Sequence, residues 1–453
     1  MIPAYLRRRY RRKNKKAMSI EELLTRISKP SYTFIDLFAG CGGLSLGLMN
    51  AGWKGLFAVE KEQNAFETLH HNLVSRSTGP SYEWPVWLER GPSNTSKIIT
   101  KYHKELLALR GYVDLIAGGP PCQGFSLAGR RKKTDSRNKL FIQYMKFVKL
   151  VQPRMVIMEN VKGITIEFGK KKRDTLRGRV PGRRPKPFAD RIMESLEKLG
   201  YTVVPLLLKA VDFGVPQLRP RYFVIGMKRT LSPEYDVAYL KNLIDRARIE
   251  FLEEKGLPNN GYVSSREALS DLEVGEKRLI DCIDTPGFQQ IEYGGPQTHY
   301  QKLMHGNMNG VAPNSLRLAN HRENTKFRFR QIIETCRPGV SLSDDDRARL
   351  GLGKHCIVAL DPNRPSHTLT TLPDDIIHYS EPRILTVREC ARLQSFPDWF
   401  EFRGKYTTGG ERRVHECPRY TQVGNAVPPL LGEAIGKVLV ELLGNTGAPA
   451  GHH

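Results

Sequence analysis

The stretch Val113-Asp114-Leu115-Ile116-Ala117-Gly118-Gly119-Pro120-Pro121-Cys122-Gln123-Gly124-Phe125-Ser126 decides the fold. Its apolar beginning is typical of a buried parallel strand. The prolines that follow end the strand, because proline has no N–H to donate to a sheet. Cys122 is therefore expected on a loop at the carboxyl end of the strand, where open α/β sheets bind ligands. Such a cysteine is either a small buried hydrophobic residue or a nucleophile, and this stretch leaves both open.

The segments on either side of this strand alternate between apolar runs and helical patterns. Alternation at this spacing predicts a doubly wound, Rossmann-like α/β sheet. We expect this first domain over residues 30–229, with a C-terminal return over residues 415–445. Its expected strands are residues 32–38, 56–60, 113–117, 155–159, 201–208 and 221–227, and its expected helices lie within residues 42–48, 64–73, 140–150 and 188–199.

The pattern changes near residue 230, where the chain becomes polar, irregular and rich in Gly, Pro and Asn. This predicts a second, smaller domain of loops and short strands over residues 230–400. Helical periodicity returns at Thr386, where Glu389 three residues later predicts a capping box, and again over residues 429–443. Residues 1–29 are expected to form a basic N-terminal arm.

The composition indicates a large globular protein with an anionic partner. The chain has 453 residues, 40% of them hydrophobic, and a formal net charge of +24. This charge favours nucleic acid as the partner. Much of it lies in residues 1–16 and 168–187. Either run could contact phosphates or be a solvated segment.

Several classes of protein are disfavoured. No apolar run is long enough to span a bilayer, and the basic N-terminus lacks the apolar segment of a secretory signal. The seven cysteines are scattered without a CxxC pair. This favours reduced thiols in the cytoplasm and predicts neither a disulfide framework nor a metal site.

A glycine-rich turn follows the first strand, in Phe34-Ile35-Asp36-Leu37-Phe38-Ala39-Gly40-Cys41-Gly42-Gly43. It is either a tight strand–helix turn or a place where backbone N–H groups approach a ligand. Glu60 ends the next strand, where an acid can accept hydrogen bonds from ribose hydroxyls. Together they favour an adenosine-containing cofactor, and the lack of a Walker lysine disfavours a triphosphate.

Glu159 ends a further strand and is expected at the same edge as Cys122. It is either a solvated acid or a group that relays protons. Arg219 and Arg221 are two residues apart, so both face one side if the segment is extended. The pair suits an anionic or carbonyl-bearing substrate, or forms ordinary salt bridges.

In combination, these segments resemble the DNA (cytosine-5) methyltransferases of bacterial restriction–modification type. The resemblance spans roughly residues 32–443 and follows the order of the family's blocks. The matching blocks are Asp36-Leu37-Phe38-Ala39-Gly40-Cys41-Gly42-Gly43, Pro120-Pro121-Cys122-Gln123-Gly124-Phe125-Ser126, Glu159-Asn160-Val161, Gln217-Leu218-Arg219-Pro220-Arg221, Arg388-Glu389-Cys390-Ala391-Arg392-Leu393-Gln394 and Gln422-Val423-Gly424-Asn425-Ala426-Val427-Pro428.

The resemblance implies methyl transfer from S-adenosylmethionine to C5 of a cytosine flipped out of duplex DNA. It makes Cys122 the nucleophile that attacks C6, and Glu159 the residue that hydrogen-bonds the ring at N3 and the exocyclic amine. Arg221, and less directly Arg219, would hold the base carbonyl and the active-site loop. The implied catalytic set is Cys122, Glu159, Arg219 and Arg221.

The resemblance also implies the cofactor contacts, with Phe38 against the adenine and Glu60 on the ribose. The family usually has an aspartate that contacts the adenine amine; here Asn94 and Ser96 are the candidate replacements. The implied set of cofactor contacts is Asp36, Phe38, Gly40, Gly42, Gly43, Glu60, Leu140, Asn425 and Val427.

For DNA, the resemblance implies a mobile loop over residues 126–138 and target recognition by the second domain. The end of the target-recognition region is marked by a Thr-Leu landmark, here His367-Thr368-Leu369-Thr370-Thr371. The implied DNA contacts are Gln123, Ser126, Arg130, Arg137, Arg328, Arg330 and Thr368, with Arg317, Arg322 and Lys326 as further candidates. We expect a monomer in the cytoplasm, associated with the nucleoid, with a restriction nuclease or defence complex as a possible partner. An RNA (tRNA) cytosine-5 methyltransferase and a catalytically silent DNA-binding regulator are the alternatives.

Overall fold

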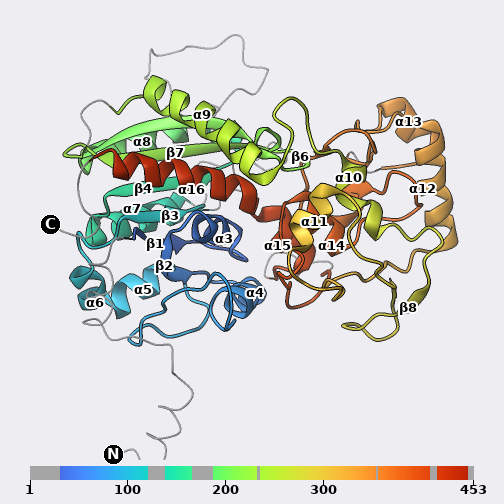
Figure 1. Ribbon diagram of the computed structural model, residues 1–453, viewed down its shortest axis with the longest axis horizontal. Coiled ribbons are helices and arrows are strands. Elements are labelled where there is room, and N and C mark those ends of the chain that lie inside the picture. Colours follow the sequence, from blue (N-terminus) through green and yellow to red (C-terminus); the bar gives the residue numbers. More distant parts are fainter. Residues whose placement is uncertain are drawn as a thin grey trace, which may run out of the picture.

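The computed structural model describes residues 31–120, 138–165, 187–231, 235–353, 356–408 and 416–446, and these form two lobes (Figure 1). The first lobe contains the large sheet and the second contains short helices and strands. The predicted basic arm and the basic run 168–187, except residue 187, lie outside the described residues. No helix in the described ranges is long and apolar enough to cross a membrane.

The first lobe is built on a six-stranded sheet in the order β2-β1-β3-β4-β7-β5. β1 to β4 run parallel, whereas β7 lies antiparallel between β4 and β5. The central strands are almost wholly buried, as expected for strands covered on both faces. The α/β prediction is therefore confirmed. The strands are β1 (Thr33–Leu37), β2 (Lys54–Val59), β3 (Leu115–Gly118), β4 (Met155–Asn160), β5 (Tyr201–Lys209) and β7 (Pro220–Lys228).

The four helices predicted within residues 30–229 are present, whereas two further helices before β3, over residues 95–101 and 103–108, were not predicted. Its last helix, α16 (Pro429–Gly444), returns from the second lobe and packs against α3 (Gly43–Asn50) (Figure 1). The two helices approach closely at Gly47, where a Cβ would come within 2.6 Å of the backbone of Glu433. The remaining helices are α4 (Gln63–Leu73), α5 (Thr95–Lys101), α6 (His103–Ala108), α7 (Asn138–Val151) and α8 (Phe188–Lys198).

The second lobe contains the short strands that the sequence predicts. β6 (Gln217–Leu218) pairs in parallel with β11 (Ser366–His367), which links the two lobes. The predicted capping box at Thr386 is confirmed at the start of α14. The other elements are β8 (Leu279–Asp281), β9 (Gln289–Ile291), β10 (Val358–Ala359), β12 (Ile376–Ile377), α10 (Ser265–Leu269), α11 (His299–His305), α12 (Glu323–Thr335), α13 (Asp344–Arg349), α14 (Val387–Leu393) and α15 (Arg419–Asn425).

The expectation that the chain is irregular after residue 230 is wrong for α9 (Val237–Lys255) and for α12. α9 buries few apolar residues, so its periodicity is weak. It is stabilised by the Asp236 cap and by ion pairs to α16. Lys255 lies 2.6 Å from Glu433, and Arg246 pairs with Glu441. α9 therefore packs against the first lobe.

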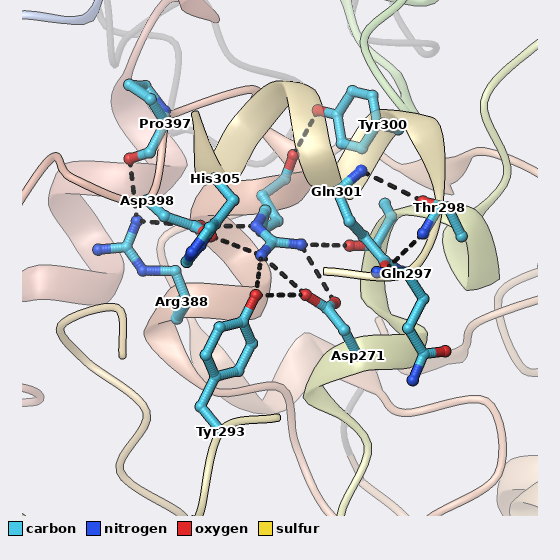
Figure 2. Close-up of polar contacts among 12 residues, drawn as sticks. Asp271, Tyr293, Gln297, Thr298, Tyr300, Gln301, His305, Arg388, Pro397 and Asp398 are labelled. Carbon is cyan, nitrogen blue, oxygen red and sulfur yellow. Dashed lines mark hydrogen bonds and ion pairs between the residues drawn. The ribbon is translucent and has the colours of Figure 1, made fainter. Parts of the chain in front are cut away.

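A buried ion network joins α14 to α10 and α11 (Figure 2). Arg392 contacts both oxygens of Asp398 at 2.6 Å and both oxygens of Asp271 at 3.0 and 3.2 Å. His305 shares Asp398 at 3.0 Å. The side chains of Arg392, Asp271 and Asp398 are fully buried. Because each charge has a bonded partner, the network fixes α14 relative to the rest of the second lobe.

We expect Arg392→Met to lower the free energy of unfolding by about 3–5 kcal/mol, because it leaves buried carboxylates without their cation. Urea unfolding measures this. Arg246→Met is the control: its pair with Glu441 is exposed, so the decrease should stay below about 1 kcal/mol. Equal decreases for the two variants would show that the network does not stabilise the lobe.

Candidate active site

The carboxyl end of β4 places an acid beside an arginine. Glu159 and Asn160 lie opposite Phe223 and Tyr222 of the antiparallel β7, so Arg221 comes next to Glu159. The Arg221 Nε lies 2.7 Å from Oε1 of Glu159, and both side chains retain slight exposure, 9% and 13%. Burial lowers the pKa of Arg221, and the charge of Glu159 opposes this shift. The pair therefore offers hydrogen-bond donors and acceptors together at the edge where the parallel strands end.

The last described residues before Cys122 lie beside this pair. A Cβ on Gly119 would lie 3.1 Å from Oε2 of Glu159, so glycine lets the carboxylate approach the backbone. The Asn160 side chain donates to the carbonyl oxygen of Pro120 at 3.1 Å. The chain is thus anchored two residues before Cys122, although Cys122 lies outside the described residues, as do Gln123, Ser126, Arg130 and Arg137. Sequence reasoning gave Asn160 no role, although it directly follows Glu159.

The predicted cofactor turn is held by Glu60. One oxygen of Glu60 accepts from the N–H of Gly40 at 2.8 Å, and the other accepts from Lys61 and Glu62, each at 2.8 Å. Burial raises the pKa of Glu60, and these hydrogen bonds oppose the shift. A carboxylate has about four acceptor sites, so Glu60 can still accept from a further donor, such as a ribose hydroxyl. Phe38, with φ 61°, turns the chain at the end of β1.

Beneath this turn, Asp36 forms a buried chain of hydroxyl groups. Ser45 Oγ donates to Asp36 at 2.5 Å, and Tyr82 donates to Ser45 at 2.6 Å. Burial raises the pKa of Asp36 to about 7 despite the Ser45 bond, with a smaller contribution from Glu60. These hydrogen bonds link β1 to α3 directly below the glycines.

The C-terminal return brings two predicted cofactor contacts, Asn425 and Val427, toward the same turn. Gly43 has no space for a Cβ, which would collide with the carbonyl oxygen of Val427. Asn425 ends α15 and its side chain is exposed. Gly42, with φ 95°, caps α3 in a conformation that favours glycine. Leu140 lies half-buried in the first turn of α7.

The candidate replacements for the adenine-contacting aspartate lie near Glu60, but Asn94 is already engaged. Its side-chain oxygen caps α5 by accepting from Lys97 at 2.8 Å, and Ser96 is exposed. Ser93, which sequence reasoning did not select, donates its N–H to the Glu60 carbonyl at 2.7 Å. Among the described residues its buried hydroxyl has no hydrogen-bond partner.

The remaining predicted contacts lie apart from one another. Arg219 is fully buried and bonds to backbone carbonyls. Thr368 donates to the Leu218 carbonyl at 2.6 Å, at the link between the lobes. Arg328 and Arg330 are exposed on α12, at the end of the second lobe farthest from the sheet (Figure 1). The structure therefore does not bring them to the Glu159 edge.

The comparisons with known proteins decide what this arrangement is. Residues 32–441 match the model of the family described as C-5 cytosine-specific DNA methylase. The chain belongs to this family. It is a DNA methyltransferase that acts at C5 of cytosine. The resemblance that the sequence blocks indicated is confirmed.

Similar proteins span most of the chain. The Type II methyltransferase M.DdeI of Desulfomicrobium norvegicum is 33% identical, covering 89% of this chain and 87% of that protein. The Type II methyltransferase M1.HphI of Haemophilus parahaemolyticus is 32% identical, covering 91% and 87%. A structure described as a DNA modification methyltransferase encoded within an E. coli prophage gives a TM-score of 0.58 at 27% identity, covering 91% of this chain and all (100%) of that one.

The described ranges hold no cluster of His, Cys, Asp and Glu side chains that could bind a metal ion. Of the free cysteines described, Cys41, Cys282 and Cys390 are buried, and burial raises the pKa of the Cys390 thiol.

We expect Asp36→Asn to change how stability depends on pH. The carboxyl pKa is 3.8 when exposed and about 7 here. Between these values the folded chain binds a proton that the unfolded chain does not, so stability falls as pH rises and is level above pH 7. The wild type should become less stable by roughly 2–3 kcal/mol between pH 5 and pH 8 through this group, and the variant should not.

Thermal unfolding at both pH values measures the difference between the two proteins. The control is Asp281→Asn, a carboxyl on the exposed strand β8, which should leave the pH dependence unchanged. If the stabilities of the wild type and Asp36→Asn changed equally between the two pH values, a raised pKa for Asp36 would be contradicted.

Proposed function

We propose that this enzyme transfers a methyl group from S-adenosylmethionine to a cytosine flipped out of duplex DNA, through a covalent adduct with Cys122. The main support is the Glu159–Arg221 pair at 2.7 Å, next to Pro120, which Asn160 anchors two residues before Cys122. The glycine turn held by Glu60 lies at the same edge of the sheet. A base and a cofactor bound there would meet at the ends of adjacent strands.

In this proposal the thiolate of Cys122 adds to C6, so an S–C6 bond forms and the C5=C6 electron pair moves to C5. When bound, S-adenosylmethionine would supply the methyl group: its methyl–sulfonium bond breaks as the C5–methyl bond forms, and S-adenosylhomocysteine leaves. Water then takes the C5 proton, and elimination of the thiolate restores the C5=C6 double bond and releases 5-methylcytosine. The ring inside a stacked duplex is inaccessible to Cys122, so the base must leave the helix.

Glu159 and Arg221 suit the two ends of the cytosine edge. A carboxyl at Glu159 can hydrogen-bond N3 and the exocyclic amine, and Arg221 can donate to the ring carbonyl. Their mutual bond holds both in place before the base arrives. Positioning of this kind reduces the entropy cost of the reaction.

The residues at the glycine turn fit the proposed cofactor. Glu60 has acceptor capacity for a ribose hydroxyl. Gly40 leaves the backbone open for the methionine part, because a Cβ there would meet nothing within 4 Å, and Gly42 and Gly43 shape the turn beside it by packing against Leu73 and Val427. Phe38 offers its ring to the adenine. We assign the adenine amine to the hydroxyl of Ser93, because that group is buried beside Glu60 and has no partner among the described residues.

The proposed role in the cell is protection of host DNA within a restriction–modification or defence system. It rests on the relatives, which are named Type II methyltransferases. We further propose that the enzyme acts as a monomer, and that the second lobe reads the target sequence.

We expect the protein to transfer tritiated methyl groups from S-adenosylmethionine to duplex DNA. Cys122→Ser should be slower by at least about a hundredfold, because a hydroxyl is a far weaker nucleophile than a thiolate. Glu159→Gln should also be slowed. Duplex DNA containing 5-fluorocytosine should trap the wild type, but not Cys122→Ser, as a covalent complex on a denaturing gel.

The same assay with tRNA tests the alternative substrate. Methylation of tRNA in preference to DNA would overturn the proposed substrate. Transfer by Cys122→Ser at the wild-type rate would overturn the proposed nucleophile, and DNA binding without any transfer would favour the silent regulator.

We also expect the basic residues 170–173 to contribute to DNA affinity that does not depend on sequence. Replacing them with glutamine should flatten the plot of log affinity against log salt by about 0.9 for each phosphate that the protein no longer neutralises. Titration of fluorescent duplex DNA at several salt concentrations measures the slope. Lys241→Gln, on the exposed face of α9, should leave it unchanged. A slope equal to that of the wild type would refute a role for residues 170–173.

A further inference from the structure

Arg219 is a fully buried arginine that lies between segments far apart in the chain. One terminal nitrogen donates to the carbonyls of Gly424 at 2.7 Å and Ala426 at 2.9 Å. The other donates to the carbonyl of Leu369 at 3.2 Å and reaches the Gln217 side chain at 3.5 Å. We call Gln217, Arg219, Leu369, Gly424 and Ala426 the Arg219 cluster.

The cluster has no carboxylate among these bonds. Burial, together with the charge of Arg221, lowers the pKa of Arg219, yet an arginine remains charged in a protein. Retaining a buried cation on carbonyl oxygens alone is costly. The benefit is geometric: one planar group fixes the carbonyls of two separate segments, the end of α15 and the chain just after β11.

The first of these segments, the end of α15, packs against the cofactor turn. Gly424 and Ala426 flank Asn425, and the carbonyl of the next residue, Val427, closes against Gly43. A Cβ on Gly424 would collide with the Thr370 carbonyl, so the end of α15 also packs tightly against the segment that contains Leu369. Any shift of the end of α15 toward a cofactor must therefore displace Arg219.

The second segment leads into the proposed target-recognition lobe. Leu369 donates its N–H to the Gln217 side chain at 2.9 Å, and Thr368 donates to the Leu218 carbonyl at 2.6 Å. Gln217 in turn bonds to Gln394 at the end of α14 at 3.0 Å. Two residues after Arg219, Arg221 pairs with Glu159. The cluster thus contacts the cofactor turn, the base site and the entrance to the second lobe.

We propose that Arg219 is a positioning residue that couples cofactor binding to DNA binding. It acts through the shared carbonyls and touches neither ligand. The proposal rests on the proposed function, because it requires both ligands to bind at the sites assigned above. Coupling of this kind is reciprocal, so each ligand should raise the affinity for the other by the same factor.

The test is the affinity for duplex DNA with and without saturating S-adenosylhomocysteine, which lacks the methyl group and cannot react. The wild type should bind DNA at least about fivefold more tightly with it. Arg219→Lys keeps the charge but removes the planar fork that holds the two segments, so the factor should fall below about twofold. Calorimetric binding of S-adenosylhomocysteine, with and without DNA, should give the same factors.

Arg388→Lys is the matched control. Arg388 is also fully buried and bonds to the carbonyls of Asn314, Pro397 and Phe400, all outside the cofactor turn. It should lower stability and leave the coupling factor unchanged. A purely structural role for Arg219 would make the two variants behave alike.

If Arg219→Lys does not fold, as judged by near-ultraviolet circular dichroism, Gln217→Met removes the carboxamide that holds Arg219 and Leu369, and should also reduce the factor. The proposal is overturned if the folded Arg219→Lys keeps the wild-type coupling factor. Where Gln217→Met replaces that variant, the same result for Gln217→Met overturns it. A wild type that shows no coupling also overturns it. These results are distinct from failure of the proposed function, in which the wild type transfers no methyl group to DNA.

Discussion

The antiparallel pairing of β7 with its neighbours β4 and β5 is the constraint on which the active site depends. Because β7 runs opposite to β4, its first residues lie at the edge where the parallel strands end. Arg221 therefore meets Glu159, and the chain just before it reaches the second lobe through β6. A parallel strand in this position would have placed Arg221 at the opposite edge, away from the acid. One reversal of direction thus sets both the pair and the connection between the lobes.

Three arginines, Arg219, Arg388 and Arg392, are fully buried, and their partners differ in kind. Arg392 is neutralised by Asp271 and Asp398, which makes a rigid joint inside the second lobe. Arg219 bonds to carbonyls instead. An ion pair fixes side chains, whereas bonds to carbonyls fix the backbone itself. The second arrangement is suited to holding loops whose position matters for a bound ligand.

The sequence was sufficient for most of the first lobe, because buried parallel strands are continuous apolar runs and their helices have regular periodicity. The capping box at Thr386 could also be predicted from the sequence. α9 was missed because ion pairs and a cap compensate for its few buried apolar residues. Among site residues, the position of Glu159 at a strand end could be predicted. Its contact with Arg221 depends on the antiparallel direction of β7, and the engagement of Asn94 as a helix cap depends on local geometry. The hydrogen bonds of Arg219 join positions about 150 and 205 residues apart, and no local pattern encodes such a distance.

The close contacts at Gly43 and Gly424 would let the proposed coupling work without a moving domain. Both glycines allow backbone to touch backbone, at Val427 and at Thr370. Backbone segments packed this closely transmit small displacements, because neither can move toward the other without a clash. A cofactor that presses on the glycine turn would shift the Val427 carbonyl, and the shift would continue through Ala426 to Arg219. From there the covalent chain itself leads to Arg221 and the base site, so the final step of transmission requires only two residues of β-strand.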